Sequence, residues 1–428
     1  LLSYLKIIFL LSNLWMCKSA PKPVKNSMKQ FASLHSRLMS SSWVLLLWMT
    51  ASMSTVVHAQ STYFPTFERL SEPVETELQT FHLDTLSDAI QLPWGIAFLP
   101  EGNTLLTERD GRLQLYRQGV MDPEPVQGVP EVYAVGQGGL LDIEPHPNVE
   151  ENGWIYISYS KPGRGGGNTA LMRARLDAST MPATLIDQEE LFAADPPTRG
   201  RVHFAGRIEF DQDGFVYLSI GDRGRMEQSQ DLSNAAGNVY RFHDDGRVPD
   251  DNPFVDNPDA IPSIFSYGHR NPQGMAMHPE TGIIWTHEHG PKGGDEINII
   301  RKGANYGWPV VTYGIDYDNS IISTETQREG MDAPLHYWDP SIAPSGMEFI
   351  QGDRYEGWTG ALMVGALKYQ MLVRVELENE QFKKEERFLE GIGRIRELEM
   401  GPDGYLYILA EGPSYLMRLV PQGDSGLN

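Results

Sequence analysis

The first residues that could do chemistry are His203 and Asp222, which flank one predicted β-hairpin. His203 precedes the turn at residues 211–214, and Asp222 follows the alternating strand that comes after it. A hairpin brings the outer ends of its two strands together, so we expect the imidazole and the carboxylate to meet. A carboxylate fixes an imidazole in one tautomer and makes it more basic, as a general base must be. A lone histidine is more often a packed or surface residue, so the pair alone leaves that interpretation open.

A second group of polar residues is cationic. Arg270 and Asn271 share a glycine-flanked loop, where a guanidinium beside a carboxamide suits an anionic or quinone oxygen. Lys368 follows a predicted strand. Arg394 and Arg396 precede another strand and, being two residues apart, share one of its faces. If these residues converge, they form a pocket for a polycarboxylate; salt bridges between neighbouring elements explain them equally well.

The segment from His287 to His289 (His-Glu-His) invites a zinc interpretation. Two imidazoles two apart on a strand point the same way, however, and no third ligand lies nearby in the sequence. The glycines and proline that follow, at residues 290–294, expose backbone carbonyls instead. With Asp295 and Glu296 they offer the hard oxygen ligands that calcium prefers.

These residues must be positioned by β-structure, because one turn-and-strand phrase recurs along the chain. Each copy combines Gly with Pro, Asp, Glu or Asn and is followed by an alternating strand, which is typical of hairpins. The copies are at residues 99–106, 146–157, 211–218, 278–285, 352–364 and 401–409. Six hairpin units that each need a neighbour to bury their second face predict an all-β fold, a six-bladed β-propeller of four-stranded antiparallel blades. A β-sandwich with coincidental turns is the alternative.

The first 59 residues differ in composition from the rest. They contain six basic residues and no acidic ones, with an apolar run at 43–51 and small residues ending at Ala59. This pattern predicts a secretory signal peptide that starts at Met28 and is cleaved after Ala59, with 1–27 as upstream sequence. A membrane anchor is the alternative, but the run is short for a bilayer. We therefore expect a periplasmic or secreted protein whose mature chain does not insert into a membrane.

Residues 60–428 contain no long linker and are expected to form a single propeller domain. Removal of the six basic residues would take the formal charge from −22 to −28, which makes nucleic acid a poor partner. The only cysteine, Cys17, lies in the predicted leader. Thiol catalysis and Cys₄ zinc sites are thus excluded from the mature chain.

At these loops the sequence resembles the soluble PQQ-dependent sugar dehydrogenases (PQQ is pyrroloquinoline quinone), and within them the bacterial aldose sugar dehydrogenase branch. The matching phrases follow the family's order over nearly all of the predicted mature chain. They are GQGGLLDIEPHP (136–147), HFAGR (203–207), SIGD (219–222), PDDNPF (249–254), YGHRNPQGMA (267–276), EHGPKGGDEIN (288–298), KGANYGWP (302–309), GALK (365–368) and GRIRELEMGPDGYLY (393–407).

The resemblance implies oxidation of an aldose at its C1 hydroxyl to a lactone, with PQQ and calcium as cofactors. His203 would take the hydroxyl proton while hydride passes to C5 of the quinone, and Asp222 would hold the imidazole. Arg270 would stabilise charge on the quinone oxygen. Asn271 and, with it, Lys368, Arg394 and Arg396 would bind PQQ.

The resemblance also assigns metal and substrate contacts. The backbone carbonyls of Gly290 and Pro291 would coordinate calcium, and Gln137 would face the sugar. A second calcium is implied near Thr312 and Asp316.

Specificity and partners follow from the same resemblance. Val202 stands where the glucose-specific branch has an acidic residue, so a broad range of aldoses is expected rather than glucose alone. The reduced enzyme would need an external electron acceptor, and it would be a monomer or a homodimer. Two other functions remain open at this point, a calcium-dependent propeller lactonase and a non-catalytic sugar-binding propeller.

Overall fold

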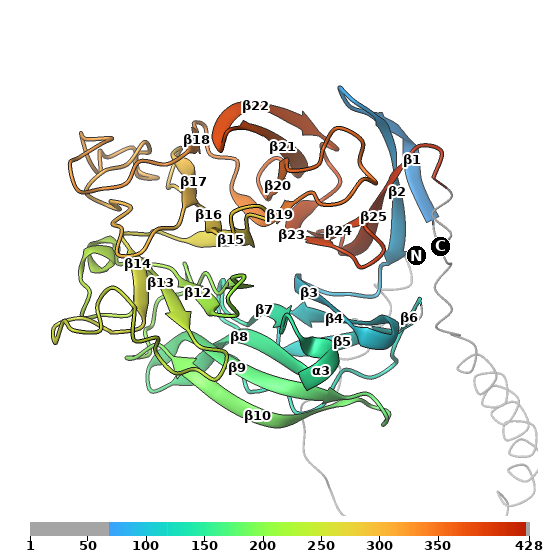
Figure 1. The fold of residues 1–428 in the computed structure, drawn as a ribbon, viewed down its shortest axis with the longest axis horizontal. Helices are drawn as coiled ribbons and strands as arrows, with labels where there is room; N and C mark the ends of the chain where they lie inside the picture. The colour runs from blue at the N-terminus through green and yellow to red at the C-terminus, as the bar shows by residue number, and fades with distance from the viewer. Residues whose placement is uncertain (1–67, 118, 425–428) are drawn as a thin grey trace, which may run out of the picture. The chain divides into compact units, whose positions relative to one another are not determined.

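The computed structural model describes residues 68–117 and 119–424, which form six antiparallel sheets around a central axis (Figure 1). Five sheets have four strands each. In chain order they are β3 (Pro93–Leu99), β4 (Asn103–Glu108), β5 (Arg112–Arg117) and β6 (Val120–Met121); β7 (Leu140–Pro145), β8 (Trp154–Gly163), β9 (Gly166–Asp177) and β10 (Thr184–Ala193); β11 (Ile208–Phe210), β12 (Val216–Ile220), β13 (Asn238–Phe242) and β14 (Ile264–Tyr267); β15 (Pro272–Met277), β16 (Ile284–Glu288), β17 (Asp295–Ile299) and β18 (His336–Trp338); and β19 (Pro344–Phe349), β20 (Leu362–Ala366), β21 (Met371–Glu378) and β22 (Gln381–Phe388). The predicted six-bladed propeller is confirmed.

The sixth blade joins the two ends of the described chain. It contains β23 (Arg394–Met400), β24 (Leu406–Glu411) and β25 (Tyr415–Pro421), and its fourth strand is β2 (Thr80–Ser87), which pairs antiparallel with β25. A fifth strand, β1 (Glu68–Glu75), lies outside β2. This blade therefore has one strand more than the sequence predicted. The ring is closed by hydrogen bonds between strands from opposite ends of the chain.

The recurring turn has the same position in every blade, between the first and second strands. In the third blade the amide of Gly214 donates to the carbonyl of Asp211 at 3.0 Å, and Gly214 has a φ of 80°, which glycine adopts without strain. Two turns contain short helices, η1 (Pro100–Gly102) and α3 (Val149–Asn152). Since strands alternate in direction, the connections from the second to the third strand, and from one blade to the next, lie on the opposite face.

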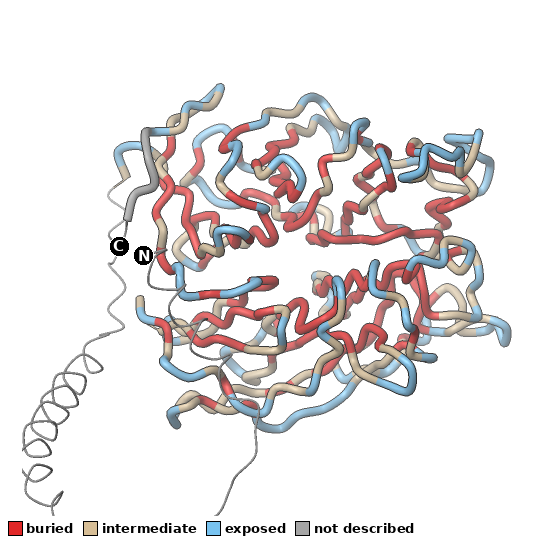
Figure 2. Tube along the Cα trace, turned by 180° about the vertical axis from the view of Figure 1, so that it is seen from behind, coloured by how far each residue is buried: buried red, intermediate tan, exposed pale blue. Residues whose placement is uncertain are grey.

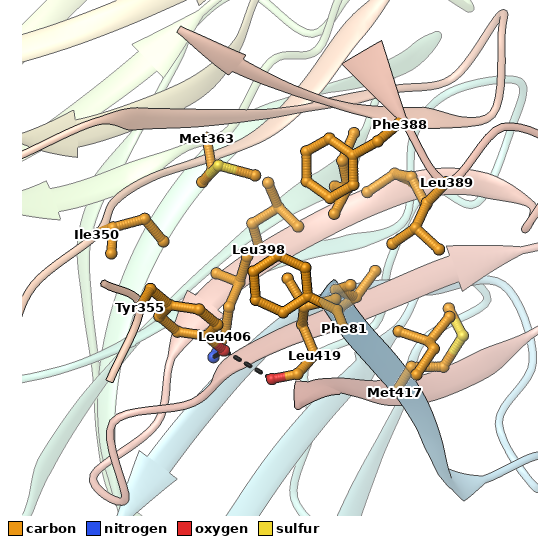
Figure 3. Packing of buried hydrophobic residues seen from close by; sticks show 14 of the residues in the cluster. Phe81, Ile350, Tyr355, Met363, Phe388, Leu389, Leu398, Leu406, Met417 and Leu419 are labelled. Atoms are coloured by element: carbon orange, nitrogen blue, oxygen red, sulfur yellow. Dashed lines mark hydrogen bonds between the residues drawn. The ribbon is translucent and has the colours of Figure 1, made fainter. Parts of the chain in front are cut away.

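Apolar side chains fill the space between neighbouring blades. Figure 2 shows the buried stretches along the inside of the sheets and exposed ones in the outer loops. Between the last two blades, the hydroxyl of Tyr355 donates to the carbonyl of Leu419 at 2.7 Å and accepts from the amide of Leu406 at 2.7 Å (Figure 3). Trp358, at 0% exposure, packs beside Tyr355. A buried tyrosine with both hydrogen bonds made can join two blades without an unsatisfied polar atom.

A buried arginine, Arg207 at the start of the third blade, connects the inner strands near the axis. Its guanidinium pairs with Glu397 of β23, lies 3.3 Å from Asp142 of β7, and donates to the carbonyl of Gln273 at 2.6 Å. It also stacks 4.1 Å from the ring centroid of Trp94 in β3. The charge is thus paired and every inner strand involved is held by the same side chain.

Four glutamates of the inner strands lie close enough for the charge of one to raise the pKa of another. They are Glu144 (β7), Glu209 (β11), Glu348 (β19) and Glu399 (β23). Burial, followed by the charge of Glu348, raises the pKa of Glu209 to about 8, and burial raises that of Glu348 to about 7. These carboxyls therefore hold protons near neutral pH in the folded protein.

This cluster predicts a loss of stability with rising pH. The folded state binds the proton of Glu209 more tightly than the unfolded chain, whose ordinary value is 4.5, so the free energy of unfolding falls between about pH 5 and pH 8. Glu209→Gln should make that fall shallower in urea unfolding measured across this range. Glu101→Gln, in an exposed turn, is the matched control and should keep the wild-type slope. Equal slopes for all three proteins would contradict the prediction.

The predicted signal peptide, its start at Met28 and its cleavage after Ala59, lies outside the described residues. Within residues 68–117 and 119–424, no helix is long and apolar enough to cross a membrane.

Candidate active site

Four of the predicted site residues lie in connections on the face opposite the recurring turns. His203 precedes β11, Asp222 follows β12, and Arg270 and Asn271 join β14 to β15. Gly221 marks where these segments approach, because a Cβ there would lie 2.5 Å from the carbonyl oxygen of His203 and 3.0 Å from that of Arg270. Only glycine lets three functional loops pack so closely.

The side chains of His203 and Asp222 meet. Nδ1 of His203 lies 2.6 Å from Oδ1 of Asp222, which also accepts from the amide of Gly224 at 2.7 Å. Burial lowers the pKa of His203, while the hydrogen bond to Asp222 works in the opposite direction. Burial tends to raise the pKa of Asp222, but the hydrogen bond and charge of His203 lower it overall. At neutral pH the arrangement is a neutral imidazole that donates from Nδ1 to a carboxylate, leaving Nε2 to accept a proton.

The backbone around His203 is held in an unusual conformation. His203 and Ala205 have φ values of 54° and 52°, in the left-handed region that non-glycine residues rarely adopt. The guanidinium of Arg223 lies 3.3 Å from the ring centroid of Phe204 and donates to the carbonyl of Gly200 at 2.7 Å. Such strain persists only where the surroundings fix it, and Arg223 supplies that restraint.

Gln137 also contacts this loop. The side-chain oxygen of Gln137 accepts from the backbone amide of His203 at 2.6 Å. The backbone amide of Gln137 donates to the carbonyl of Arg201 at 2.9 Å. The sequence assigned Gln137 to the sugar. In the structure it lines the neighbouring pocket while its oxygen holds the backbone of His203.

Arg270 and Asn271 are both buried and share one carboxylate. Glu288 accepts from the amides of both residues, and its other oxygen lies 3.0 Å from Nδ1 of His269. The guanidinium of Arg270 donates to the carbonyls of His289 and Gly290 at 2.9 and 3.0 Å. Glu288 therefore sets the position of this loop; the sequence considered it only as part of a possible zinc motif.

Beside these loops is a pocket of about 320 Å³ built from connections around the whole ring. Its wall is polar with aromatic parts. It is lined by Trp94, Arg109, Gln137, Phe204, Ala205, Asn271, Gln273, His289, Ala343, Leu367, Arg394, Arg396 and Glu411. His203 itself is not part of this wall, although the two residues after it are.

The pocket wall carries three guanidinium groups and one carboxylate. Arg396 lies 2.9 Å from Glu411 and Arg394 lies 3.5 Å from it, so both arginines share a face although β23 has a bulge between Ile395 and Glu397. Arg109 donates to the carbonyl of Gly136 at 3.1 Å. The two interpretations left open by the sequence, a cationic pocket and salt bridges between elements, therefore both apply to Arg394 and Arg396. The excess positive charge of the wall suits an anion with several carboxylates.

The sequence did not single out Arg109. Arg109 directly follows the second strand of its blade, and His289 does the same in its own blade. Asp222 and Lys368 each come two residues after the second strand of their blades. Their shared position after a second strand was the signal that could have identified Arg109.

A family comparison now bears on this site. The model of the Glucose / Sorbosone dehydrogenase family matches residues 90–418. The chain belongs to this family. The resemblance predicted from the sequence motifs is therefore confirmed.

Individual members of the family cover most of the chain. The aldose sugar dehydrogenase YliI of Escherichia coli is 38% identical over 373 residues, which are 86% of this chain and 100% of the relative. A crystal structure of a glucose dehydrogenase, at 41% identity, has a TM-score of 0.77 and covers 80% of this chain and 99% of its own. The PQQ-bound aldose sugar dehydrogenase of Streptomyces coelicolor, at 25% identity, has a TM-score of 0.66 with coverage of 83% and 100%.

Lys368 of this glucose/sorbosone dehydrogenase family member is exposed at the rim. Its ammonium donates to the carbonyl of Ser341 at 3.0 Å, and its neighbour Leu367, not Lys368, lines the pocket. A lysine here reaches the pocket only by a change of rotamer, which its long side chain permits.

The predicted calcium ligands are less well arranged for an ion. The carbonyl of Gly290 accepts from Arg270 at 3.0 Å, which places a positive charge beside it. Asp295 is at 0% exposure and accepts from the amide of Gly290 at 2.8 Å and from the hydroxyl of Ser341 at 2.7 Å, so its oxygens are in use. Pro291 is buried next to Gly290.

At the second predicted calcium position, the oxygens of Thr312 and Asp316 each bond to a neighbouring backbone amide and have no partner in common among the residues that the structure describes. The hydroxyl of Thr312 accepts from the amide of Gly314 at 3.2 Å, and Asp316 accepts from the amide of Tyr317 at 2.6 Å. Within the described ranges, no three His, Cys, Asp or Glu residues are grouped so that they could hold a metal. Both calcium sites stay predictions.

The contact between His203 and Asp222 predicts a measurable change in basicity. In Asp222→Asn the imidazole loses the partner that favours its charged form, while burial still disfavours it. The pKa of His203 should therefore fall further in an NMR titration of the ligand-free protein. Asp211→Asn, in the turn of the same blade, should leave that titration unchanged. A rise, or no change, in Asp222→Asn would contradict the role of Asp222.

Proposed function

We propose that the protein is a quinoprotein aldose dehydrogenase, which oxidises an aldose at the C1 hydroxyl to the lactone with PQQ as hydride acceptor. The observation that carries the proposal is a neutral imidazole held by a carboxylate, His203 and Asp222, beside a cationic pocket. Membership in the glucose/sorbosone dehydrogenase family and the PQQ-bound relative support it.

His203 is the general base in this proposal. Nε2 takes the proton of the C1 hydroxyl as the C1–O bond becomes a carbonyl, and the hydride from C1 leaves with its electron pair. PQQ, when bound, supplies the electrophilic carbon that accepts this hydride. The depressed pKa of His203 keeps Nε2 unprotonated at neutral pH, as a base requires.

The pocket supplies the binding charges. Arg394, Arg396 and Arg109 face it with guanidinium groups, which match carboxylates in bidentate geometry. Asn271 adds a carboxamide, and Lys368 would reach the pocket from the rim after a change of rotamer. Arg270, buried beside the pocket, would stabilise negative charge on a quinone oxygen because its guanidinium is fixed in advance.

Calcium enters the proposal only through the sequence resemblance. The carbonyl of Gly290 already accepts from Arg270, and the carboxylate of Asp295 is bonded to protein donors, so the contacts described do not favour an ion there. No step of the reaction is therefore assigned to it.

The proposal also covers the substrate range, the location and the electron acceptor. Val202 is 36% exposed next to the base and offers no charge to select one sugar hydroxyl pattern, which favours a broad range of aldoses. The two electrons taken from each sugar must pass to an external acceptor. We infer a periplasmic or secreted protein from the leader composition of residues 1–59. A monomer or homodimer is inferred separately, from the resemblance to the family.

The direct test is reconstitution with PQQ, with and without calcium, followed by reduction of an artificial electron acceptor with a panel of aldoses. Turnover is expected with several sugars. His203→Gln should lose roughly a hundredfold or more of kcat, since general base catalysis typically contributes that much, but keep PQQ binding. Lactone hydrolysis without cofactor would favour the lactonase alternative. Sugar binding without any turnover would favour a non-catalytic propeller.

Arg396 provides a separate test of the cofactor pocket. In Arg396→Gln the carboxylate of Glu411 loses a buried cation 2.9 Å away and repels an anionic ligand, so PQQ affinity should fall roughly tenfold or more. Titration followed by PQQ absorbance measures this. Arg374→Gln is the matched control, because Arg374 is also buried and pairs with Glu386 at 2.9 Å, away from the pocket wall. Equal affinities in the two variants would remove Arg396 from the binding site.

A further inference from the structure

Besides His203 and the amide of Gly224, the carboxylate of Asp222 has a further partner that the reaction proposed above does not use. Its Oδ2 accepts from the indole Nε1–H of Trp308 at 2.9 Å, while Oδ1 faces Nδ1 of His203 at 2.6 Å. Asp222 is 1% exposed and Trp308 is 6% exposed. The two carboxylate oxygens of Asp222 therefore face different partners, and both Asp222 and Trp308 are buried.

An indole is a suitable group to hold this carboxylate. It donates one hydrogen bond, accepts none and does not ionise, so it cannot compete with His203 for a proton. If the carboxylate of Asp222 turned away, the indole N–H would be left buried without an acceptor, which is unfavourable. Trp308 thus restricts Asp222 to the orientation in which Oδ1 faces the imidazole.

Trp308 is itself held from two sides. Its amide donates to the carbonyl of Gly268 at 2.9 Å, and its carbonyl accepts from the side chain of Gln230 at 2.8 Å. The guanidinium of Arg270 lies 5.3 Å from the centroid of its ring. The indole therefore connects the segment that carries Asp222 with the loop that carries Arg270.

We propose that Trp308 is a positioning residue that fixes the carboxylate of Asp222, and through it the tautomer and direction of the His203 imidazole. The catalytic consequence rests on the function proposed above. The effect on the imidazole does not, because it depends only on contacts within the chain.

The sign of the effect follows from the charges that face His203. Asp222 favours the imidazolium, whereas the charges of Arg270 and Arg223 disfavour it. The indole donor delocalises and stabilises the negative charge of Asp222, which weakens its attraction for a proton on His203. Without that donor the carboxylate attracts the imidazolium more strongly. The pKa of His203 should then rise, opposite to the fall expected in Asp222→Asn.

The test is an NMR titration of ¹⁵N-labelled, ligand-free protein, with the His203 signal assigned by its loss in His203→Gln. Trp308→Phe should raise the midpoint of His203 by about 0.5 or more on the pH scale. The neutral His203 imidazole of Trp308→Phe should also populate the Nδ1–H tautomer less fully than that of the wild type. Trp338→Phe is the matched control, since Trp338 is also buried and donates from its indole to Glu385 at 2.6 Å, away from His203. A Trp308→Phe titration like that of wild type or Trp338→Phe would overturn the proposal.

A second variant separates the hydrogen bond from the packing. Benzothienylalanine at position 308 keeps the bicyclic ring and replaces the indole N–H with sulfur, which does not donate a hydrogen bond, so it should reproduce the shift even if Trp308→Phe folds poorly. An unshifted titration in this variant also overturns the proposal.

The kinetic readout distinguishes the two levels of inference. If the protein is an aldose dehydrogenase, the acid limb of kcat/KM in Trp308→Phe should move to higher pH and kcat should fall, with little change in PQQ affinity. A shifted titration in a protein that oxidises no aldose would refute the proposed function and leave the role of Trp308 intact. Normal turnover with an unshifted titration would support the proposed function and refute the role of Trp308.

Discussion

Closure of the ring is the constraint on which the rest of this structure depends. The last blade is complete only when β2, from the N-terminal end of the described chain, pairs with β25 near the other end. Every blade has a first strand near the axis, and the pocket draws its wall from connections around the entire ring. An open ring would leave two sheet edges unpaired and would separate Arg109 of the first blade from Arg396 of the last. Fold and binding pocket therefore form together.

The axis shows how such a ring tolerates buried charge. Arg207 satisfies its guanidinium with Glu397, Asp142 and two backbone carbonyls, and it packs on Trp94. Just beyond it, the acidic cluster retains protons rather than full charge, because burial and mutual repulsion disfavour ionisation. The pocket carries three guanidinium groups and one carboxylate, so an anionic ligand is favoured at this face of the ring.

The candidate active site is organised by residues that do not themselves touch a ligand pocket. Glu288 holds the backbone of Arg270 and Asn271, Arg223 restrains the strained segment that bears His203, and Trp308 occupies the second oxygen of Asp222. Each of these supporting residues is buried, and each makes polar contacts that keep a functional group in one orientation. Precise positioning here comes from buried hydrogen bonds as well as from apolar packing.

The sequence by itself determined the all-β class, the six blades and the pairing of His203 with Asp222. Those features depend on local turn chemistry and on residues a hairpin apart, which the chain order expresses directly. It could not show that β2 closes the last blade, because that pairing joins β2 to β25 from a distant part of the chain. The recurring turn phrase also gave no sign of β1, which pairs with its neighbour β2 outside the six repeats. It missed Arg109, considered Glu288 only within a zinc motif that it did not favour, and gave Trp308 no role. Arg109 and Trp308 act through groups of other blades, and Glu288 acts through backbone amides at the end of its own hairpin. Local patterns specified the blades, and the contacts between blades, which no single segment encodes, decided what the face of the propeller can bind.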